Sequence, residues 1–251
     1  MLIATKDSVY EFFSNTNYEK PVLIADEISV RRVLEGEKTK IIALSEGTIL
    51  LEAEGDRKRI ESGINDRIDS LCLVKEEPLN ILIGCTPPNL YRLKENEGKA
   101  VRSDSFDGLD ERKDWYTPWG GPAAVRSTAI SGDGWVYADI HVGSIMRSND
   151  HGETWEPVKP GLHVDVHEVA TSSTDNEMVY ANTFLSVYVS EDRGESWSHR
   201  SENLRNRYGR GIAVNPYAPS FICFGSSSFF SGISFSWNLL GAFLGVPLPD
   251  G

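Results

Sequence analysis

Three basic side chains occupy matching positions in the second half of the sequence, each at the start of a short apolar run. They are Arg126 in VRSTAIS, His167 in VHEVATS and Arg210 in GRGIAVN, and a looser alignment adds Arg31 in SVRRVL and Asp69 in IDSLCLV. The guanidinium group of arginine binds carboxylate or phosphate through two parallel hydrogen bonds. Several such groups around one point predict a focused anion site within an acidic protein. The alternative is that they pair with neighbouring loops and acidic partners and only close the structure.

Two Asp-x-His pairs follow the same part of the chain. Asp139 and His141 lie in ADIHVG, and Asp165 and His167 lie in DVHEV. Histidine and aspartate bind zinc or manganese, but the pattern clusters no third ligand with either pair. A histidine held by a nearby carboxylate is the more ordinary arrangement. We therefore expect these residues to contribute to the ligand site, and we predict no metal and no cofactor.

A doubled octapeptide sets the spacing of the elements that must position these residues. SNDHGETW (148–155) and SEDRGESW (190–197) share the pattern Ser-x-Asp-x-Gly-x-(Ser/Thr)-Trp. An Asp in a tight turn accepts hydrogen bonds from its own backbone, and Gly permits a positive φ. We expect a structural turn rather than catalytic carboxylates or calcium ligands. The residues with this role are Ser148, Asp150, Gly152 and Trp155, and Ser190, Asp192, Gly194 and Trp197.

A weaker repeat extends through the chain and predicts the fold. Each repeat contains four short segments with strand-like alternation, the fourth expected to end at the octapeptide Trp. The third segment recurs at intervals of 40, 41, 55 and 42 residues, as VYEF (9–12), ILLE (49–52), LYRL (90–93), IMRS (145–148) and VYVS (187–190). A period of about 40 residues with four strands is typical of a β-propeller. We predict an all-β propeller of five to seven four-stranded antiparallel blades, with first strands that meet at a channel mouth.

The domain prediction has two parts. Residues 1–220 form the propeller, with an insertion at 102–122 that accounts for the long interval. Residues 221–251 form an atypical tail or a partial blade, because no charged residue occurs between Phe221 and Pro249. Seven blades would need about 290 residues plus the insertion, so a truncated or shifted end would explain both features.

The insertion contains three aromatic residues within the segment WYTPWGGP. Trp115, Tyr116 and Trp119 could stack on a sugar ring, because their faces are apolar and their edges polar. Equally, the segment could pack down against the blades as a plug. Both interpretations stay open.

Composition excludes some partners. The 251-residue chain has a formal net charge of -12, which disfavours nucleic acid and anionic membranes. The three cysteines, Cys72, Cys85 and Cys223, lie in apolar runs without metal-ligand spacing, which favours reduced thiols. We expect no signal peptide, because MLIATKDSVYEFF lacks a basic segment followed by a long apolar one, and no transmembrane helix, because no stretch of eighteen uncharged apolar residues occurs. We predict a soluble, cytoplasmic monomer.

These residues also carry a family resemblance. The two octapeptides, with WGGPAAVRSTA, DIHVGSIMRS and DVHEVAT, resemble the Asp-box or BNR repeat of sialidase-like and WD40/YVTN/BNR-like propellers. The resemblance covers residues 1–220, most firmly 120–216. It implies that the Asp-boxes lie on the rim away from the substrate face. By this resemblance, a working sialidase would need three arginines that bind the substrate carboxylate, a Tyr–Glu nucleophile pair, an Asp acid/base and an Arg-Ile-Pro motif near the start. That motif does not occur here, so no catalytic role is transferred.

Three functions compete on these grounds. The first is a propeller that binds a small anionic or sugar-like ligand, or a protein partner, at a cationic channel mouth. The second is a sialidase-like glycoside hydrolase with a divergent site, which requires two carboxylates beside the scissile bond; the candidates are Asp69, Asp139 and Asp165. The third is a scaffold protein that uses its outer surface.

Overall fold

The computed structural model describes residues 2–11, 21–26, 29–95, 97–202, 204, 206–215, 218 and 222–227. Two compact units share the chain, Met1–Asp104 and Ser105–Gly251. Within the described residues no helix is both long and apolar enough to cross a membrane.

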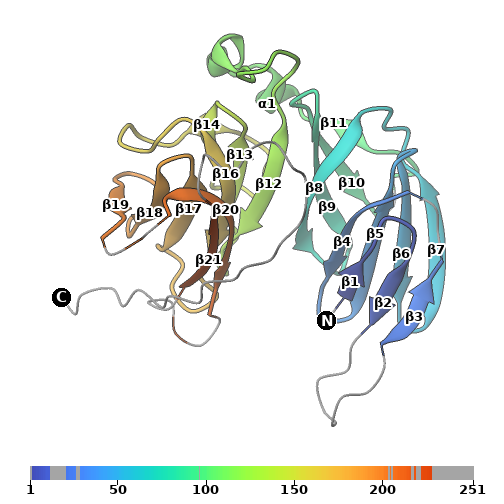
Figure 1. Cartoon of the computed structure of the whole chain (residues 1–251). Coiled ribbons are helices and arrows are strands. Elements are labelled where there is room, and N and C mark those ends of the chain that lie inside the picture. Colours follow the sequence, from blue (N-terminus) through green and yellow to red (C-terminus); the bar gives the residue numbers. More distant parts are fainter. Residues whose placement is uncertain are drawn as a thin grey trace. The chain divides into compact units, whose positions relative to one another are not determined.

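The first unit consists of antiparallel sheets in which each strand pairs with the next along the chain (Figure 1). One sheet has three strands and two have four. Their strands are β1 (Leu2–Ala4), β2 (Val9–Glu11) and β3 (Val22–Ala25); β4 (Val30–Glu35), β5 (Thr39–Leu44), β6 (Thr48–Ala53) and β7 (Asp56–Glu61); and β8 (Arg67–Lys75), β9 (Asn80–Thr86), β10 (Leu90–Lys94) and β11 (Val101–Arg102).

The second unit repeats the same sheet order after two short helices, α1 (Asp104–Asp107), which begins at the boundary, and η1 (Asp110–Asp114). Two four-stranded sheets are followed by a pair of strands. Their strands are β12 (Val125–Ile130), β13 (Val136–Ile140), β14 (Ser144–Ser148) and β15 (Glu156–Pro157); β16 (Val166–Thr171), β17 (Val179–Thr183), β18 (Ser186–Ser190) and β19 (Ser198–Arg200); and β20 (Tyr208–Val214) and β21 (Ile222–Ser227).

The strand pattern confirms the predicted all-β fold class with four-stranded antiparallel blades. In each four-stranded sheet the predicted third segment lies in the third strand, namely in β6, β10, β14 and β18. The remaining copy, VYEF, begins β2, and its last residue lies outside the described residues. Strand β21 belongs to the segment that we assigned to the tail, and residues 228–251 of that segment lie outside the described residues.

One detail of the predicted repeat is wrong, because the fourth strand follows the octapeptide Trp instead of ending there. Strand β15 begins at Glu156 and β19 at Ser198, directly after Trp155 and Trp197. The turn uses the preceding backbone amides for its own hydrogen bonds, since Asp150 accepts hydrogen bonds from the amides of Glu153 and Thr154. Those amides are therefore not available to a strand ladder.

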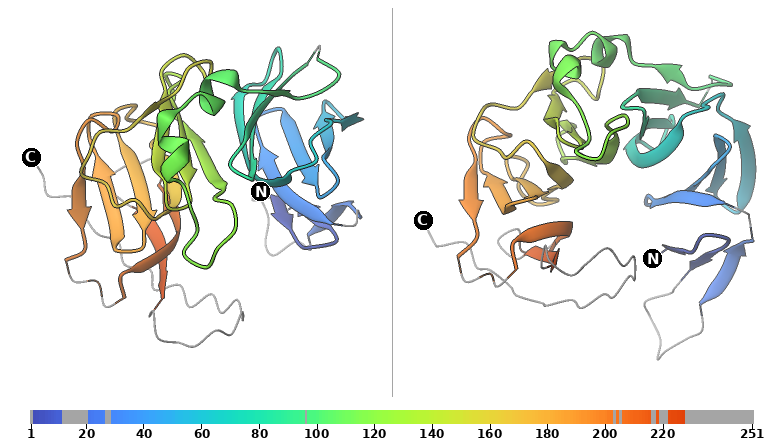
Figure 2. Two further views of the ribbon diagram at one scale, coloured as in Figure 1. Left: turned by 90° about the horizontal axis from the view of Figure 1, so that it is seen from above. Right: turned by 45° about the horizontal axis from the view of Figure 1, so that its top comes forward.

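Within each unit, the core lies between successive sheets. Strand side chains alternate between the two faces of a sheet, and both faces carry apolar residues here. Tyr137 and Ile145 of one blade pack with Val169, Val179 and Tyr188 of the next. In the second unit, β16 contacts β12 on one side and β20 on the other, so the first strands are neighbours (Figure 2).

Candidate functional site

The aligned polar residues share a backbone feature that the sequence did not reveal, a β-bulge in the strand that carries each of them. In β12, Val125 pairs with Ile140 and Ser127 with Asp139, so Arg126 is the extra residue. Bulges re-aim a side chain and occur often beside functional sites. The same irregularity falls on every aligned position: Arg31 in β4, Asp69 in β8, His167 in β16, and Arg210 with Gly211 in β20.

In the first unit the two bulge residues pair with each other. Arg31 Nη2 lies 3.5 Å from Asp69 Oδ1, and Arg67 Nε lies 2.9 Å from the same oxygen. The Thr86 hydroxyl also donates to Asp69, which is only 5% exposed. The Asp69 carboxylate is thus occupied by contacts within its own unit.

In the second unit the fold brings together three of the predicted residues, His141, Asp165 and His167. The Nε2 atoms of His141 and His167 lie 3.6 Å and 3.2 Å from Asp165 Oδ1. One donor atom from each residue lies within 4.8 Å of both others. Both histidines are buried and Asp165 is half-buried, so the cluster is largely removed from water.

The backbone around the cluster is fixed by hydrogen bonds. The His141 amide donates to Ala124 O at 3.0 Å, directly after β13. Directly before β16, Asp165 O accepts the Phe184 amide at 3.0 Å. The His167 ring contacts the Gly209 carbonyl through Nδ1. The three side chains therefore come from element ends that belong to two blades, and a third blade supplies Gly209.

Burial and neighbouring charges determine the protonation states in the cluster. Burial, with a contribution from Arg126, lowers the pKa of His141 to about 4, so this ring is neutral at pH 7. Burial alone would raise the pKa of Asp165, but His167, His141 and Arg126 outweigh it and hold this pKa below its ordinary value. The cluster therefore contains one carboxylate and at least one neutral imidazole.

Asp139 does not join the cluster. It is fully buried, and its Oδ2 accepts a hydrogen bond of 2.6 Å from Ser127 on the adjacent strand. Burial raises the pKa of Asp139 to about 7. This carboxyl group is part of the blade interior and is not presented to a ligand.

The two arginines beside the cluster differ from Arg31. Arg126 is half-buried and Arg210 is exposed, and neither forms an ion pair within the described residues. Both are close enough to lower the pKa of His141. Arg210 lies 4.6 Å above the ring of Tyr208. Sequence reasoning missed Tyr208 and Gly209, and only their adjacency to Arg210 could have indicated them.

The aromatic insertion is packed down in one part and exposed in another. Trp115 is half-buried and packs against Phe106, with ring centroids 5.6 Å apart. Trp119 is 74% exposed, and its ring centroid lies 4.9 Å from that of His141. Tyr116 is also exposed. Part of the insertion is therefore packed down, while Trp119 remains open to solvent beside the cluster.

The octapeptides form closed hydrogen-bonded turns. Asp150 accepts from Ser148 Oγ at 2.7 Å and from the amide and hydroxyl of Thr154 at 2.8 and 2.6 Å. Asp192 accepts equivalent bonds from Ser190 and Ser196, at 2.8, 2.8 and 2.6 Å. Each turn thus satisfies its own carboxylate.

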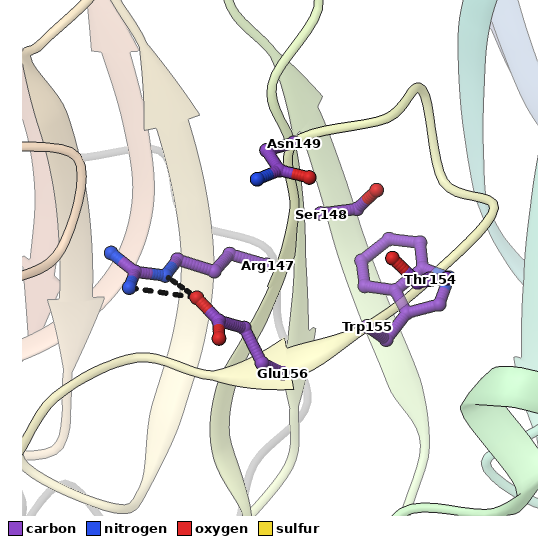
Figure 3. Close-up of a pocket in the computed structure, with 6 residues that line it drawn as sticks. All are labelled: Arg147, Ser148, Asn149, Thr154, Trp155 and Glu156. Carbon is purple, nitrogen blue, oxygen red and sulfur yellow. Dashed lines mark hydrogen bonds and ion pairs between the residues drawn. The ribbon is translucent and has the colours of Figure 1, made fainter.

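A small pocket opens beside the first octapeptide (Figure 3). Arg147 in its wall pairs with Glu156 and Glu195 and donates to Arg193 O at 2.9 Å. Its guanidinium also lies 5.4 Å from the Trp135 ring. These contacts join two blades, so the charged groups of this pocket are used to hold the structure together.

These features together define a β-propeller, whose complete blades are four-stranded antiparallel sheets with a bulge in the first strand. Among solved structures, the chain is similar to an ancestral GH74 enzyme, with a TM-score of 0.58 and 13% identity over 79% of this chain and 28% of that one. It is also similar to the WD40 β-propeller domain of Doa1, with a TM-score of 0.57 and 13% identity over 79% of this chain and 62% of that one. The chain therefore spans less than two thirds of either structure, and at this identity the similarity shows the fold alone. No protein-family model and no curated protein sequence matches the chain.

Proposed function

We propose that this protein is a propeller binding module that captures a small anionic ligand between Arg126 and Arg210. The observation that carries the proposal is that these two bulge arginines form no ion pair within the described residues, whereas their counterpart Arg31 is neutralised by Asp69. An arginine that no carboxylate contacts within ion-pair distance can bind a carboxylate or phosphate from outside. The anion would add the missing charge.

Two aromatic side chains extend the proposal to sugar acids. Trp119 is exposed beside His141, and Tyr208 lies under Arg210. An aromatic face packs on the apolar face of a sugar while the arginines bind its carboxylate. An acidic segment of a protein partner would meet the same two arginines. The free thiols of Cys72, Cys85 and Cys223 support a cytoplasmic location.

Glycoside hydrolysis is the alternative, and the similarity to a GH74 enzyme favours considering it. Hydrolysis needs two carboxylates that can reach one glycosidic bond. Asp139 is fully buried against Ser127, and Asp69 is held by Arg67 and Arg31 in the first unit. Of the three candidates, only Asp165 is partly exposed, and its contacts are with His141 and His167. This arrangement supports binding better than hydrolysis.

The test is ligand-induced thermal stabilisation of the native chain and of R126A, R210A and the double variant. Inorganic phosphate and glucuronate serve as anionic probes, and glucose is the neutral control. We expect both anions to raise Tm in the native protein and to lose this effect in the double variant. Arg59→Ala removes an exposed arginine from β7 and should retain it. Equal stabilisation of the native and double-variant proteins would refute the site, and release of reporter from aryl glycosides would favour the hydrolase.

A further inference from the structure

The second Asp-x-His pair places a histidine ring nitrogen directly against a buried carboxylate oxygen. The Gly209 carbonyl is only an acceptor, so the contact with His167 Nδ1 places the proton on that nitrogen. The other ring nitrogen, Nε2, faces Asp165 Oδ1 at 3.2 Å. This oxygen is buried and accepts no hydrogen bond within the described residues. An imidazole nitrogen and a carboxylate oxygen that face each other in a buried site need a positive charge between them, which either a proton or a metal ion supplies.

His141 completes the set of donors around the same point. Its Nε2 lies 3.6 Å from Asp165 Oδ1, and all three donor atoms lie within 4.8 Å of one another. Donors bound to one tetrahedral zinc ion at about 2.0–2.1 Å lie about 3.4 Å apart. We propose that His141 Nε2, Asp165 Oδ1 and His167 Nε2 bind a single divalent transition-metal ion of the zinc class.

Contacts behind the donors match the support that such ligands have. A metal-bound histidine usually donates its other ring N–H to a carbonyl or carboxylate, which fixes the ring. His167 does so to Gly209 O. Asp165 is held through its backbone, since its amide donates to His163 Nδ1 at 3.1 Å and its carbonyl accepts from Phe184. The site is thus oriented before an ion enters.

Three protein ligands leave at least one coordination position open, as in zinc sites that bind a further molecule. Arg126 and Arg210 make the surroundings more positive and oppose a divalent ion that carries no other anion. An anionic ligand in the open position would offset part of the positive charge of the arginines and the metal. This inference goes beyond anion binding by the arginines, and the metal would be retained when the arginines are removed.

The experiment uses the full chain after treatment with EDTA and dialysis. Zinc chloride is titrated by calorimetry, and cobalt(II) chloride by visible absorption, which reports the coordination number. We expect one zinc per chain, a cobalt spectrum of a four- or five-coordinate site, and at least a tenfold loss of affinity in H141A and D165N. His199→Ala removes an exposed histidine on β19 and should leave zinc binding unchanged.

Two further measurements keep the test decisive. Circular dichroism establishes that each variant is folded; H141A is the main variant, because the structure gives its side chain no hydrogen bond within the described residues. The R126A/R210A protein should still bind zinc, so failure of anion binding and failure of the metal site are distinguishable. The proposal is overturned if the native chain binds neither ion, or if H141A and D165N bind zinc as tightly as the native chain.

Discussion

His141 Nε2 lies 3.6 Å from Asp165 Oδ1, although the two residues belong to different blades. Val125 pairs with Ile140, so β13 ends where β12 begins. Strand β16 lies beside β12, and Asp165 directly precedes it. The end of a second strand and the start of the next first strand therefore meet, and the cluster links consecutive blades.

Trp119 should contribute to ligand binding and little to stability. Its side chain is 74% exposed and lies beside His141. We expect Trp119→Ala to change the free energy of unfolding by less than about 0.5 kcal/mol, as exposed positions do. The same variant should weaken binding of glucuronate more than binding of phosphate, because only the sugar has a ring to stack. Chemical denaturation and calorimetry measure the two effects.

The matched control is Trp115→Ala in the same insertion. Trp115 packs against Phe106 and is half-buried, so its loss should reduce stability by about 1–3 kcal/mol or more. If Trp119→Ala destabilised the protein as much as Trp115→Ala, Trp119 would be a packing residue and not a ligand contact.

Ser127 should be a structural clamp between two blades. Its hydroxyl accepts the Val169 amide at 2.9 Å and donates to Asp139 at 2.6 Å. Ser127→Ala removes both bonds and should lower the free energy of unfolding by about 1–3 kcal/mol. Urea denaturation measures this loss, and exposed Ser198 on β19 offers a control substitution to Ala with little effect. Equal stability of the two variants would show that the Val169 and Asp139 groups find other partners.

The octapeptide should stabilise the fold in a pH-dependent manner. Burial opposes ionisation of Asp192, but hydrogen bonds from Ser196 and Ser190 outweigh it and lower its pKa. A lowered folded-state pKa gives stability that is complete above the ordinary Asp value of about 3.9 and is lost as pH falls below it. Asp192→Ala should cost about 1–3 kcal/mol near neutral pH, and Asp192→Asn should flatten the acid side of the stability curve. Anion binding per folded molecule should be unaffected, since a loss of binding with the fold preserved would assign the turn a role at the site.

The repeat pattern was sufficient to predict the blades, because each blade is formed by strands that are adjacent in sequence. It also aligned Arg126, His167 and Arg210 correctly, although nothing in the letters shows that a bulge occupies each position. A bulge depends on pairing with the next strand. Alignment therefore found the positions, and only the register explains why their side chains are special.

The composition of the cluster was harder to predict. The two Asp-x-His pairs look equivalent in sequence, but Ser127 faces Asp139 across the sheet and captures its carboxylate. Asp165 directly precedes β16, so within the described residues no serine faces it across the sheet as Ser127 faces Asp139. His141 consequently joins Asp165 and His167, and a third donor appears that local spacing does not show.

Gly209 should be required because a side chain of the preceding blade fills the space beside it. A Cβ atom at Gly209 would lie 1.6 Å from Asn182 Oδ1, while Asn182 Nδ2 donates to Gly211 O at 2.8 Å. Gly209→Ala should therefore destabilise the protein by about 1–3 kcal/mol, as overpacking does. Asn182→Ala removes the amide that would overlap with the new Cβ atom. The double variant should therefore lose less free energy of unfolding than the two single variants lose in sum, by at least about 1 kcal/mol. Gly98→Ala, where no atom lies within 4 Å, is the control, and strictly additive costs of Gly209→Ala and Asn182→Ala would show that steric overlap is not the reason for this glycine.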